Sequence, residues 1–519
     1  MHDTPPTPLW TRQTFLFLGF VILLSFLTYF FRYAEPQRVY WDENYHIASA
    51  QKYLHGVFFM EQHPPLGKLL VAAGEKLLHP NEKSDQFLNT DYGRNFPDTF
   101  SFAGYRFFPA LLAWLAAPLL FFIFLLVTRH ALFSTLLSFL YIFDNALLVH
   151  LRGAMLEGPL VFFSLLTILC FLLLLERRPD AAKPSKGKRM TAAISILFGA
   201  AFALVATTKV VGLVFILLVP VWLWAWRPLR TQELAQRSAT WKRMSKGLGL
   251  FLLGFVVVYA GVWEIHFARG KRIVSELPDN GYYQSSDTAK WYLDNGKAGS
   301  LFAFPAMLAD AWHFVSHYNA GTPRLDLCKA DENGSPWYMW PLGGRSINYR
   351  WETPDSKEYR YLYLQSNPVV WLASFFAVLI GAALLLCSVV LDLKKPLRNR
   401  FHLTVFLGLY VAYMIAISRI TRVLYLYHYF IPLLFSFIIL GLVVMEIQQI
   451  AGWKLTEHRK TIALLVFAGL IFASFEFYRP FTYYEPLTDA QFARRNILSV
   501  WDLACVNCEK VNSLAISCK

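Results

Sequence analysis

Charged side chains are scarce in this sequence of 519 residues: only 16% of them are Asp, Glu, Lys or Arg, whereas 56% are hydrophobic and 17% aromatic. About a quarter of the residues of a soluble domain are charged, so this composition indicates a protein that crosses a membrane several times. Acidic residues are the scarcest, 35 against 49 basic ones. The basic residues gather in short clusters between apolar runs, which is typical of cytoplasmic membrane loops and argues against nucleic acid as a partner.

Metal-binding patterns are also lacking. His313 and His317 stand four residues apart in WHFVSHYN, but no Glu lies between them as in the HExxH motif. No other His, Cys or Asp cluster has the spacing of metal ligands. We therefore predict no metal site and no cofactor, with a divalent ion left as the alternative. The sequence contains no internal repeat, whereas paired repeats are common in transporters.

Apolar runs of about 17 residues or more predict roughly eleven membrane-spanning helices. The four connecting segments rich in Lys and Arg are expected inside the cell, which places the N-terminus inside and the C-terminus outside. No small-residue cleavage site follows the first run, so we expect an anchored first helix. The predicted fold is an all-α polytopic membrane protein with helices near residues 14–31, 107–128, 131–149, 157–175, 191–207, 209–226, 247–265, 368–391, 402–418, 423–446 and 461–478.

Two long segments fall outside the membrane in this topology. The second is rich in Trp, Tyr, Gly and Pro, and a long loop in a compact protein is usually functional. We expect it to fold over the outer ends of the helices. The predicted organisation is an N-terminus with the first helix (1–31), a first external loop with the catalytic motif (32–106), helices two to seven (107–265), a large external loop (266–366), helices eight to eleven (367–478) and an external tail (479–519).

An acidic pair, Asp42 and Glu43, directly follows the first apolar run in VYWDENYHIASAQKYLHG. A short helix is predicted from this pair to the His-Gly stop. In a structural interpretation Asp42 caps that helix and Glu43 complements its dipole. In a catalytic interpretation one carboxylate acts as a base, and the two interpretations are compatible. Further on, His63 and Lys68 of EQHPPLGKLL either contact an anion or pack as ordinary interfacial residues.

The acidic pair and HPPLGKLL together resemble the first external loop of the protein O-mannosyltransferases, membrane glycosyltransferases of the GT-C class. The resemblance continues in the family's order through GYRFFPALLAWLAAPL, LRGAMLEGPLVFF, TTKVVGLVFI, SPWYMWPLGGRSINYRW, NPVVWLASFFAVL and YLYHYFIPLLF. It implies a GT-C fold with two large external loops. About a hundred residues are too few for the β-trefoil module of the eukaryotic members, so the chain resembles the short bacterial form.

The resemblance implies inverting transfer of mannose from a polyprenyl phosphate to Ser or Thr hydroxyls of secreted or membrane proteins, at the outer face of the plasma (inner) membrane. A carboxylate that accepts the hydroxyl proton contributes on the order of 10² to 10⁴ in rate. We assign this role to Asp42 and give Glu43 a positioning role, with the reverse assignment left open.

The negative charge that develops on the leaving phosphate must be neutralised by a metal ion or by fixed cations. Long basic side chains at helix ends also snorkel to the membrane surface without any such role. The predicted phosphate-binding residues are Arg106, Lys209, Arg419 and Arg422, and the predicted substrate-binding residues are His63, Lys68, Trp337 and Arg345.

The partners expected from the resemblance are the lipid-linked sugar donor, the acceptor protein, membrane lipids, and either a second copy of the chain or the secretion machinery. Two alternative functions are a sugar transferase that acts on lipid or glycan, as the aminoarabinose transferases do, and a lipid flippase or transporter. Four cysteines are predicted outside, where an oxidising compartment permits disulfides: Cys328, Cys505, Cys508 and Cys518.

Overall fold

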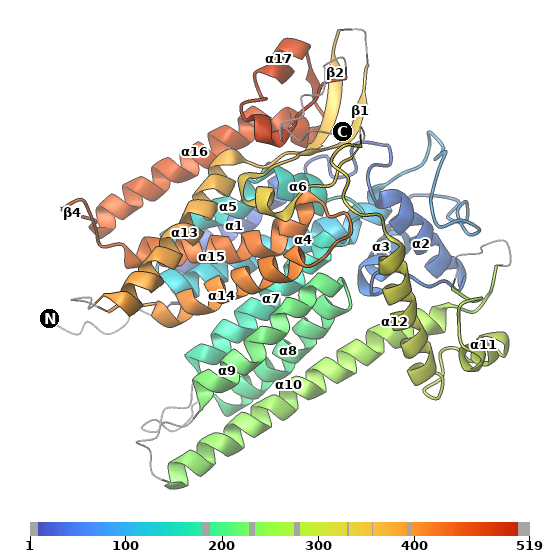
Figure 1. The fold of residues 1–519 in the computed structure, drawn as a ribbon, viewed down its shortest axis with the longest axis horizontal. Coiled ribbons are helices and arrows are strands. Elements are labelled where there is room, and N and C mark those ends of the chain that lie inside the picture. The colour runs from blue at the N-terminus through green and yellow to red at the C-terminus, as the bar shows by residue number, and fades with distance from the viewer. Residues whose placement is uncertain are drawn as a thin grey trace. The chain divides into compact units, whose positions relative to one another are not determined.

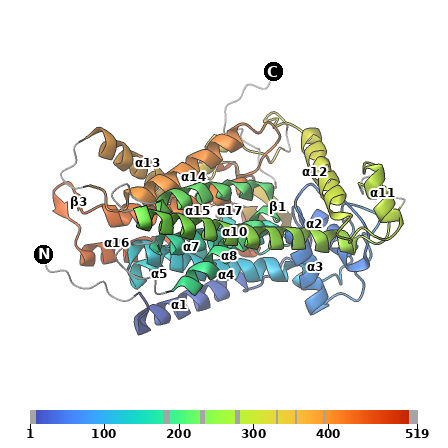
Figure 2. The same ribbon diagram turned by 90° about the horizontal axis from the view of Figure 1, so that it is seen from below.

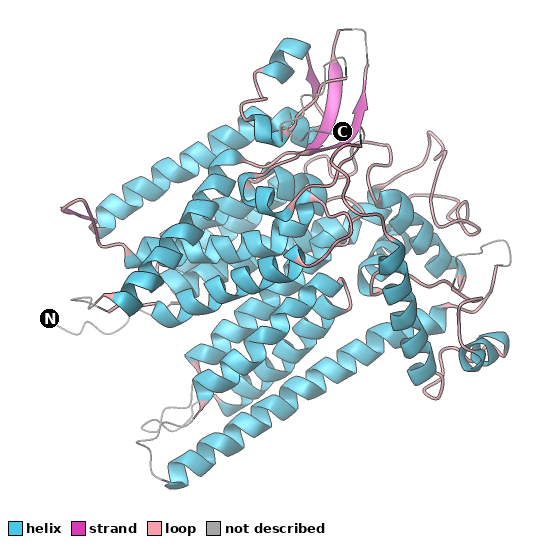
Figure 3. Cartoon of the chain, in the orientation of Figure 1, coloured by secondary structure: helices cyan, strands magenta, loops and turns pink. Residues whose placement is uncertain are grey.

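A computed structural model describes residues 9–177, 187–227, 234–274, 281–329, 332–354, 357–391 and 396–506 of the chain. The described residues are mostly helical (Figures 1 and 3), as the sequence predicts. The chain divides into two compact units. Unit 1 comprises Met1–Phe31, Trp114–His150 and Arg324–Lys519, and unit 2 comprises Arg32–Ala113 and Leu151–Pro323. The large external loop is therefore shared between the units.

Nine helices among the described residues are long and apolar enough to cross a membrane. They confirm nine of the predicted spans. These helices are Arg12–Tyr29 (α1), Ala103–Thr128 (α4), Glu157–Glu176 (α7), Lys188–Ala206 (α8), Leu234–Arg269 (α10), Pro368–Val390 (α13), Arg400–Ser418 (α14), Leu426–Tyr429 (η3) continued by Phe430–Glu446 (α15), and Glu457–Tyr483 (α16).

The predicted span at 131–149 is not one straight helix. It consists of Ala131–Ile142 (α5) and Asn145–Leu151 (α6), which are bent by 64° at the break between them. Asp144 causes the break, because its Oδ1 accepts a hydrogen bond of 2.8 Å from the backbone N–H of Leu147 and so starts a new helix. The side chain of Asn367 donates to the backbone oxygen of Phe143 at 2.9 Å and satisfies one carbonyl that the break frees.

The predicted span at 209–226 is a short segment of mixed helix type. It begins as a 3₁₀-helix, Val210–Leu217 (η1), and continues as an α-helix, Leu218–Trp226 (α9). A 3₁₀-helix rises about 2.0 Å per residue and an α-helix about 1.5 Å, so the segment reaches roughly 30 Å, which is the thickness of a bilayer core. The tighter winding lets fewer residues cover the distance of a regular span.

Unit 2 is built on helices α7 to α10, which lie side by side (Figure 1, green). Helices α8 and α10 approach closely because glycines face the other helix: a Cβ atom at Gly199 would lie 1.9 Å from the oxygen of Phe251. The unit also contains Glu43–His55 (α2), Leu66–Leu78 (α3), Asp287–Asp294 (α11) and Phe304–Gly321 (α12). Helix α12 lies at the C-terminal end of α10 (Figure 2), where Trp312 Nε1 donates to Tyr259 Oη at 3.0 Å.

Unit 1 packs its helices around α15, which is almost entirely buried and contacts α13 and α14. Its small antiparallel sheet (Figure 3, magenta) has the strand order β1-β2-β5 and joins the large loop to the tail, which the sequence treats as separate segments. The remaining elements are Trp337–Leu342 (η2), Ile347–Glu352 (β1), Tyr359–Leu364 (β2), Gln449–Ile450 (β3), Trp453–Lys454 (β4), Pro486–Leu487 (β5), Asp489–Ala493 (α17) and Ser499–Trp501 (η4).

Two of the four cysteines predicted outside, Cys328 and Cys505, are disulfide-bonded. Cys508 and Cys518 lie outside the described residues. Cys505 belongs to the aromatic core that the tail forms with strand β2, together with Tyr361, Tyr363 and Trp501. The disulfide expectation is therefore confirmed for the two described cysteines.

Candidate active site

The acidic pair stands at the start of helix α2, as the sequence predicts. The helix ends at Gly56, whose φ of 67° is the left-handed conformation that glycine adopts without strain. Asp42 occupies the N-cap position, but its side chain makes no capping hydrogen bond and is partly exposed. Trp41 before it also has a positive φ, 50°, a strained value for a bulky residue of the kind that accumulates at functional sites.

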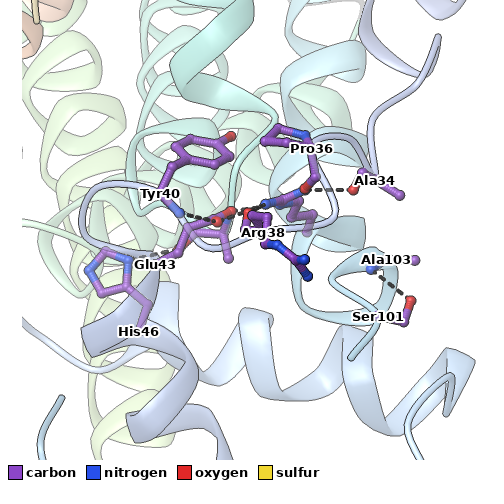
Figure 4. A network of polar contacts seen from close by, with 10 residues as sticks. Ala34, Pro36, Arg38, Tyr40, Glu43, His46, Ser101 and Ala103 are labelled. Atoms are coloured by element: carbon purple, nitrogen blue, oxygen red, sulfur yellow. Dashed lines mark hydrogen bonds and ion pairs between the residues drawn. The ribbon is translucent and has the colours of Figure 1, made fainter. Parts of the chain in front are cut away.

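Glu43 is fully buried, and four hydrogen bonds fix its carboxylate (Figure 4). Its Oε1 accepts from Nε of Arg106 at 2.7 Å and from the backbone N–H of Ala154 at 2.9 Å. Its Oε2 accepts from Nη2 of Arg106 at 2.8 Å and from the backbone N–H of Tyr40 at 3.2 Å. A carboxylate bound in this way is held rigidly in one position.

Arg106, on the first turns of α4, uses all five of its N–H donors within the protein. Besides the two bonds to Glu43, Nη1 donates to the oxygens of Ala34 at 2.6 Å and Pro36 at 2.8 Å, and Nη2 donates to the oxygen of Arg38 at 2.9 Å. A guanidinium has five N–H groups, so none is left for a phosphate. This saturation argues against a phosphate contact and favours a role of Arg106 in positioning the acidic pair; its role as a phosphate ligand stays a prediction.

The HPPLGK segment places Lys68 in a buried and His63 in a half-buried environment, both among charged groups. Lys68 is 1% exposed and forms an ion pair with Glu61, which also accepts a hydrogen bond from Ser49. Burial alone would raise the pKa of Glu61, but the charge and hydrogen bond of Lys68, the hydrogen bond of Ser49 and the charge of Lys52 together hold that pKa below its ordinary value. Burial, together with the charges of Lys209 and Lys68, keeps the pKa of His63 well below its ordinary range, so His63 is neutral.

Lys209 begins the 3₁₀-helix η1 and is 7% exposed. Its Nζ lies 2.5 Å from Oε1 of Glu157, and the two form a buried ion pair. The turn before Lys209 is tied to the start of α3, because the backbone N–H of Leu66 donates to the oxygen of Thr207 at 2.9 Å. Within unit 2 the structure thus brings Lys209, His63 and Lys68 into one region.

Two carboxylates of this region are not among the predicted site residues. Glu61 and Glu157 each neutralise one of the buried lysines. The available signal was their position, since each is an acidic residue beside or within an apolar run, where an unpaired charge would be costly.

The other four predicted residues belong to unit 1. Arg419 is exposed at the end of α14, and Arg422 forms an isolated backbone bridge with Arg324. Trp337 is 39% exposed at the start of η2. The segment that carries Trp337 lies against the chain that follows Arg422, since the backbone N–H of Ser335 donates to the oxygen of Leu424 at 2.8 Å. The fourth residue, Arg345, is buried beside Asp502.

The described residues contain no group of three or more His, Cys, Asp or Glu side chains arranged to hold a metal ion. The expectation of a metal-independent reaction remains a prediction, because only a measurement of activity after chelation tests it.

The fold is that of a membrane glycosyltransferase of the GT-C class. The chain superimposes with a TM-score of 0.79 on a structure of the S. cerevisiae protein O-mannosyltransferase Pmt1-Pmt2 complex bound to the sugar donor. The sequence identity is 15%, and the match covers 95% of this chain and 93% of that one.

Two family models identify the family. The model of dolichyl-phosphate-mannose-protein mannosyltransferase matches residues 19–270, and the model of the C-terminal four-transmembrane region of protein-O-mannosyltransferase matches residues 310–501. The chain therefore belongs to the protein O-mannosyltransferase family.

Curated relatives carry the same family name. Protein O-mannosyltransferase 1 of Drosophila pseudoobscura pseudoobscura is 28% identical over 254 residues, which are 49% of this chain and 27% of the relative. Dolichyl-phosphate-mannose--protein mannosyltransferase 4 of Schizosaccharomyces pombe is 33% identical over 157 residues, which are 30% of this chain and 20% of the relative. The matched regions thus span less than a third of the length of these relatives.

Proposed function

We propose that this protein transfers mannose, with inversion, from a polyprenyl phosphate to Ser or Thr hydroxyls of secreted or membrane proteins. Membership of the protein O-mannosyltransferase family supports the reaction. The observation that carries the site is the contrast within the acidic pair: Glu43 has its four hydrogen bonds inside the protein, whereas Asp42 is partly exposed beside the strained Trp41. This contrast favours Asp42 as the base.

In the proposed reaction the acceptor oxygen attacks C1 of the mannose while its proton passes to a carboxylate oxygen of Asp42. The bond between C1 and the phosphate oxygen breaks, and the polyprenyl phosphate leaves with the electron pair. One base on the face opposite the leaving group is sufficient for inversion, and no covalent enzyme intermediate is needed. Glu43 and Arg106 act through Asp42, since their ion pair fixes the backbone from which it projects.

The charge that develops on the leaving phosphate is best met by Lys209, with Lys68 and the neutral His63 in the same region of unit 2. An ammonium has three N–H donors and suits a phosphate as a point charge. Arg419 and Arg422 stay candidates for the same role from unit 1, and Trp337 and Arg345 stay candidates for substrate contacts.

We place the enzyme in the plasma (inner) membrane with the acidic pair at the outer face. The disulfide-bonded Cys328 and Cys505 support this orientation, because disulfides persist in oxidising compartments outside the cytoplasm. The similar S. cerevisiae structure is a complex of two mannosyltransferases, which favours a second copy of this chain over the secretion machinery as a partner.

The test uses the purified full chain, labelled polyprenyl-phosphate mannose and a Ser/Thr-rich peptide. Asp42→Asn should lose about 10² to 10⁴ in turnover with little change in melting temperature, because it removes the base from a partly exposed site. Glu43→Gln should lower the melting temperature, because it breaks a buried ion pair.

Unreduced turnover in Asp42→Asn would reject Asp42 as the base. Transfer by the wild type to lipid or glycan but not to peptide would reject the proposed acceptor class.

A further inference from the structure

Unit 1 contains a pocket to which the proposed reaction assigns only one residue, Arg345, as a candidate for substrate contacts. It has a volume of about 410 Å³, within the range of about 300 to 1,000 Å³ that is typical of small-molecule sites. Three pieces of chain that are far apart in the sequence form it: the end of the large loop, strands β1 and β2, and the tail from residue 502 to 506. The lining residues that matter here are Glu332, Arg345, Asn348, Trp351, Tyr363 and Asp502.

A β-bulge in strand β1 gives the pocket its wall. Asn348 pairs with Tyr363 and Trp351 pairs with Tyr361. The two residues on β1 are three positions apart, whereas their partners on β2 are only two positions apart. The irregularity lies between Asn348 and Arg350, so Tyr349 is the extra residue. Side chains three apart on a regular strand point to opposite faces. The bulge therefore turns Asn348 and Trp351 to the same face, as bulges beside binding sites commonly do.

The tail is fixed to this wall by hydrogen bonds with two tyrosines. The hydroxyl of Tyr363 donates to the oxygen of Ala504 at 2.7 Å, and the backbone N–H of Val506 donates to the hydroxyl of Tyr361 at 3.2 Å. The disulfide-bonded Cys505 lies between them. The pocket is thus a built feature of the fold rather than a gap between loosely placed segments.

The polar groups of the pocket are suited to a ligand rich in hydroxyls. Nη2 of Arg345 donates to the oxygen of Glu332 at 2.8 Å, and its Nε lies 3.6 Å from Asp502. These are the hydrogen bond and the ion pair of the guanidinium among the described residues. A guanidinium has five N–H donors, so donors remain for a ligand. Oδ1 of Asn348 is buried and accepts no hydrogen bond from the described residues, which is unusual for a polar atom unless a ligand or water reaches it.

The charges of the lining argue against an anion such as a lipid phosphate. Arg345 contributes one positive charge, whereas Glu332 and Asp502 contribute two negative ones. Trp351, which is 46% exposed, adds a flat apolar surface. An aromatic face beside acceptors and donors matches a sugar ring, because one side of a hexose presents C–H groups and its hydroxyls both donate and accept.

We propose that this pocket binds a mannose residue that is already attached to the acceptor protein. The choice of sugar rests on the proposed function. Such a subsite would retain an acceptor after its first modification, so that neighbouring hydroxyls are modified while it is held.

The direct test measures binding of methyl α-D-mannopyranoside to the full chain in detergent, by saturation-transfer NMR or calorimetry. Asp42→Asn serves as the background, because it prevents turnover. We expect a dissociation constant on the order of 1 mM and at least a tenfold weakening, about 1.4 kcal/mol, in Trp351→Ala. Trp291→Ala is the matched control, since Trp291 is similarly exposed, at 52%, on α11 and does not line the pocket.

Three results would overturn the proposal. The first is failure of the chain with an intact pocket to bind the mannoside, or binding that is unchanged both in Trp351→Ala and in Asn348→Ala, which truncates the second wall residue. The second is displacement of the mannoside by polyprenyl phosphate, which would place the sugar at the donor site. The third is Trp351-dependent binding of an unmodified Ser/Thr peptide without mannoside binding, which would make the pocket a peptide site.

The transfer assay separates this proposal from the proposed function. Mannoside binding that depends on Trp351 in a protein without transfer activity would reject the function and keep a sugar pocket. Transfer activity without mannoside binding would reject the pocket and keep the function. If both hold, Trp351→Ala should transfer the first mannose to a peptide at the wild-type rate and lower the number of mannoses added per binding event.

Discussion

Two arginines show how differently the two units use the same side chain. In unit 2, Arg106 donates all five N–H groups to the protein, two of them to the fully buried Glu43. In unit 1, Arg345 donates one short hydrogen bond to protein and otherwise stands 3.6 Å from Asp502 at the edge of a pocket. Saturated donors indicate a structural role, whereas unused donors beside a cavity indicate a binding role. Proximity to a carboxylate alone would not separate the two cases.

Breaking the saturated site should have the largest effect. Arg106→Leu leaves the carboxylate of Glu43 buried without its partner, which costs about 3 to 5 kcal/mol of unfolding free energy. Thermal unfolding of the full chain in detergent measures the loss. The double variant Glu43→Leu/Arg106→Leu should recover part of it, because the unpaired charge is gone. A loss below 1 kcal/mol in the single variant would contradict the structural role of Arg106.

Reduction of the disulfides should destabilise unit 1 and leave unit 2 unchanged. Opening a disulfide that closes a long loop costs about 2 to 4 kcal/mol, and the loss should fall on unit 1, where Cys328 and Cys505 lie. Hydrogen exchange should accelerate in peptides from residues 486–506 and stay unchanged in peptides from 43–68. Equal acceleration in both regions would show that the units do not respond independently.

Acidification should act on unit 2. Burial and the charge of Lys68 lower the pKa of His46 from 6.5 to about 3, so the folded protein keeps this imidazole neutral while the unfolded chain protonates it below pH 6.5. His46 therefore costs the folded protein nothing above pH 6.5, and below that pH it lowers the free energy of unfolding, by about 1.4 kcal/mol at pH 5.5. The melting temperature should fall between pH 7.5 and pH 5.5, and the fall should be smaller in His46→Asn. Mannoside binding should not change over this range, because no histidine lines the pocket.

The smallest effect is expected from Arg345→Gln. This variant should change the unfolding free energy by less than about 1 kcal/mol, because the guanidinium gives up one short hydrogen bond to a carbonyl and a longer contact with Asp502. It should nonetheless weaken mannoside binding severalfold. If Arg345→Gln lowers the free energy of unfolding as much as Arg106→Leu does, Arg345 has a structural role like that of Arg106.

Sequence reasoning recovers the elements that depend on local composition. Apolar runs predict the helices because a bilayer imposes length and hydropathy on each span, and Gly56 marks the end of α2 because few other residues adopt a positive φ. The two irregular spans were predicted as regular helices. In the first, the bend at Asp144 depends on an acceptor role that its sequence neighbours do not reveal.

The sequence could not reveal which residues far apart in the chain would pair with each other. Arg106 lies at a helix end as a phosphate ligand would, but its partner Glu43 stands 63 positions earlier. The sheet was missed for the same reason: strand β5 contains two residues, too few for a strand pattern, and exists only through its pairing with β2. Side-chain saturation and strand pairing are properties of the folded chain.

The bulge in β1 lets the strand carry one extra residue without changing which side chains face the pocket. If Tyr349 were deleted, Asn348 and Trp351 would stand two positions apart and would still point to the same face of a regular strand. The deletion would instead remove the hydroxyl that lies 2.5 Å from Nδ1 of His150. Gain or loss of this residue among homologous chains would therefore change the contact with His150 and keep the wall of the pocket.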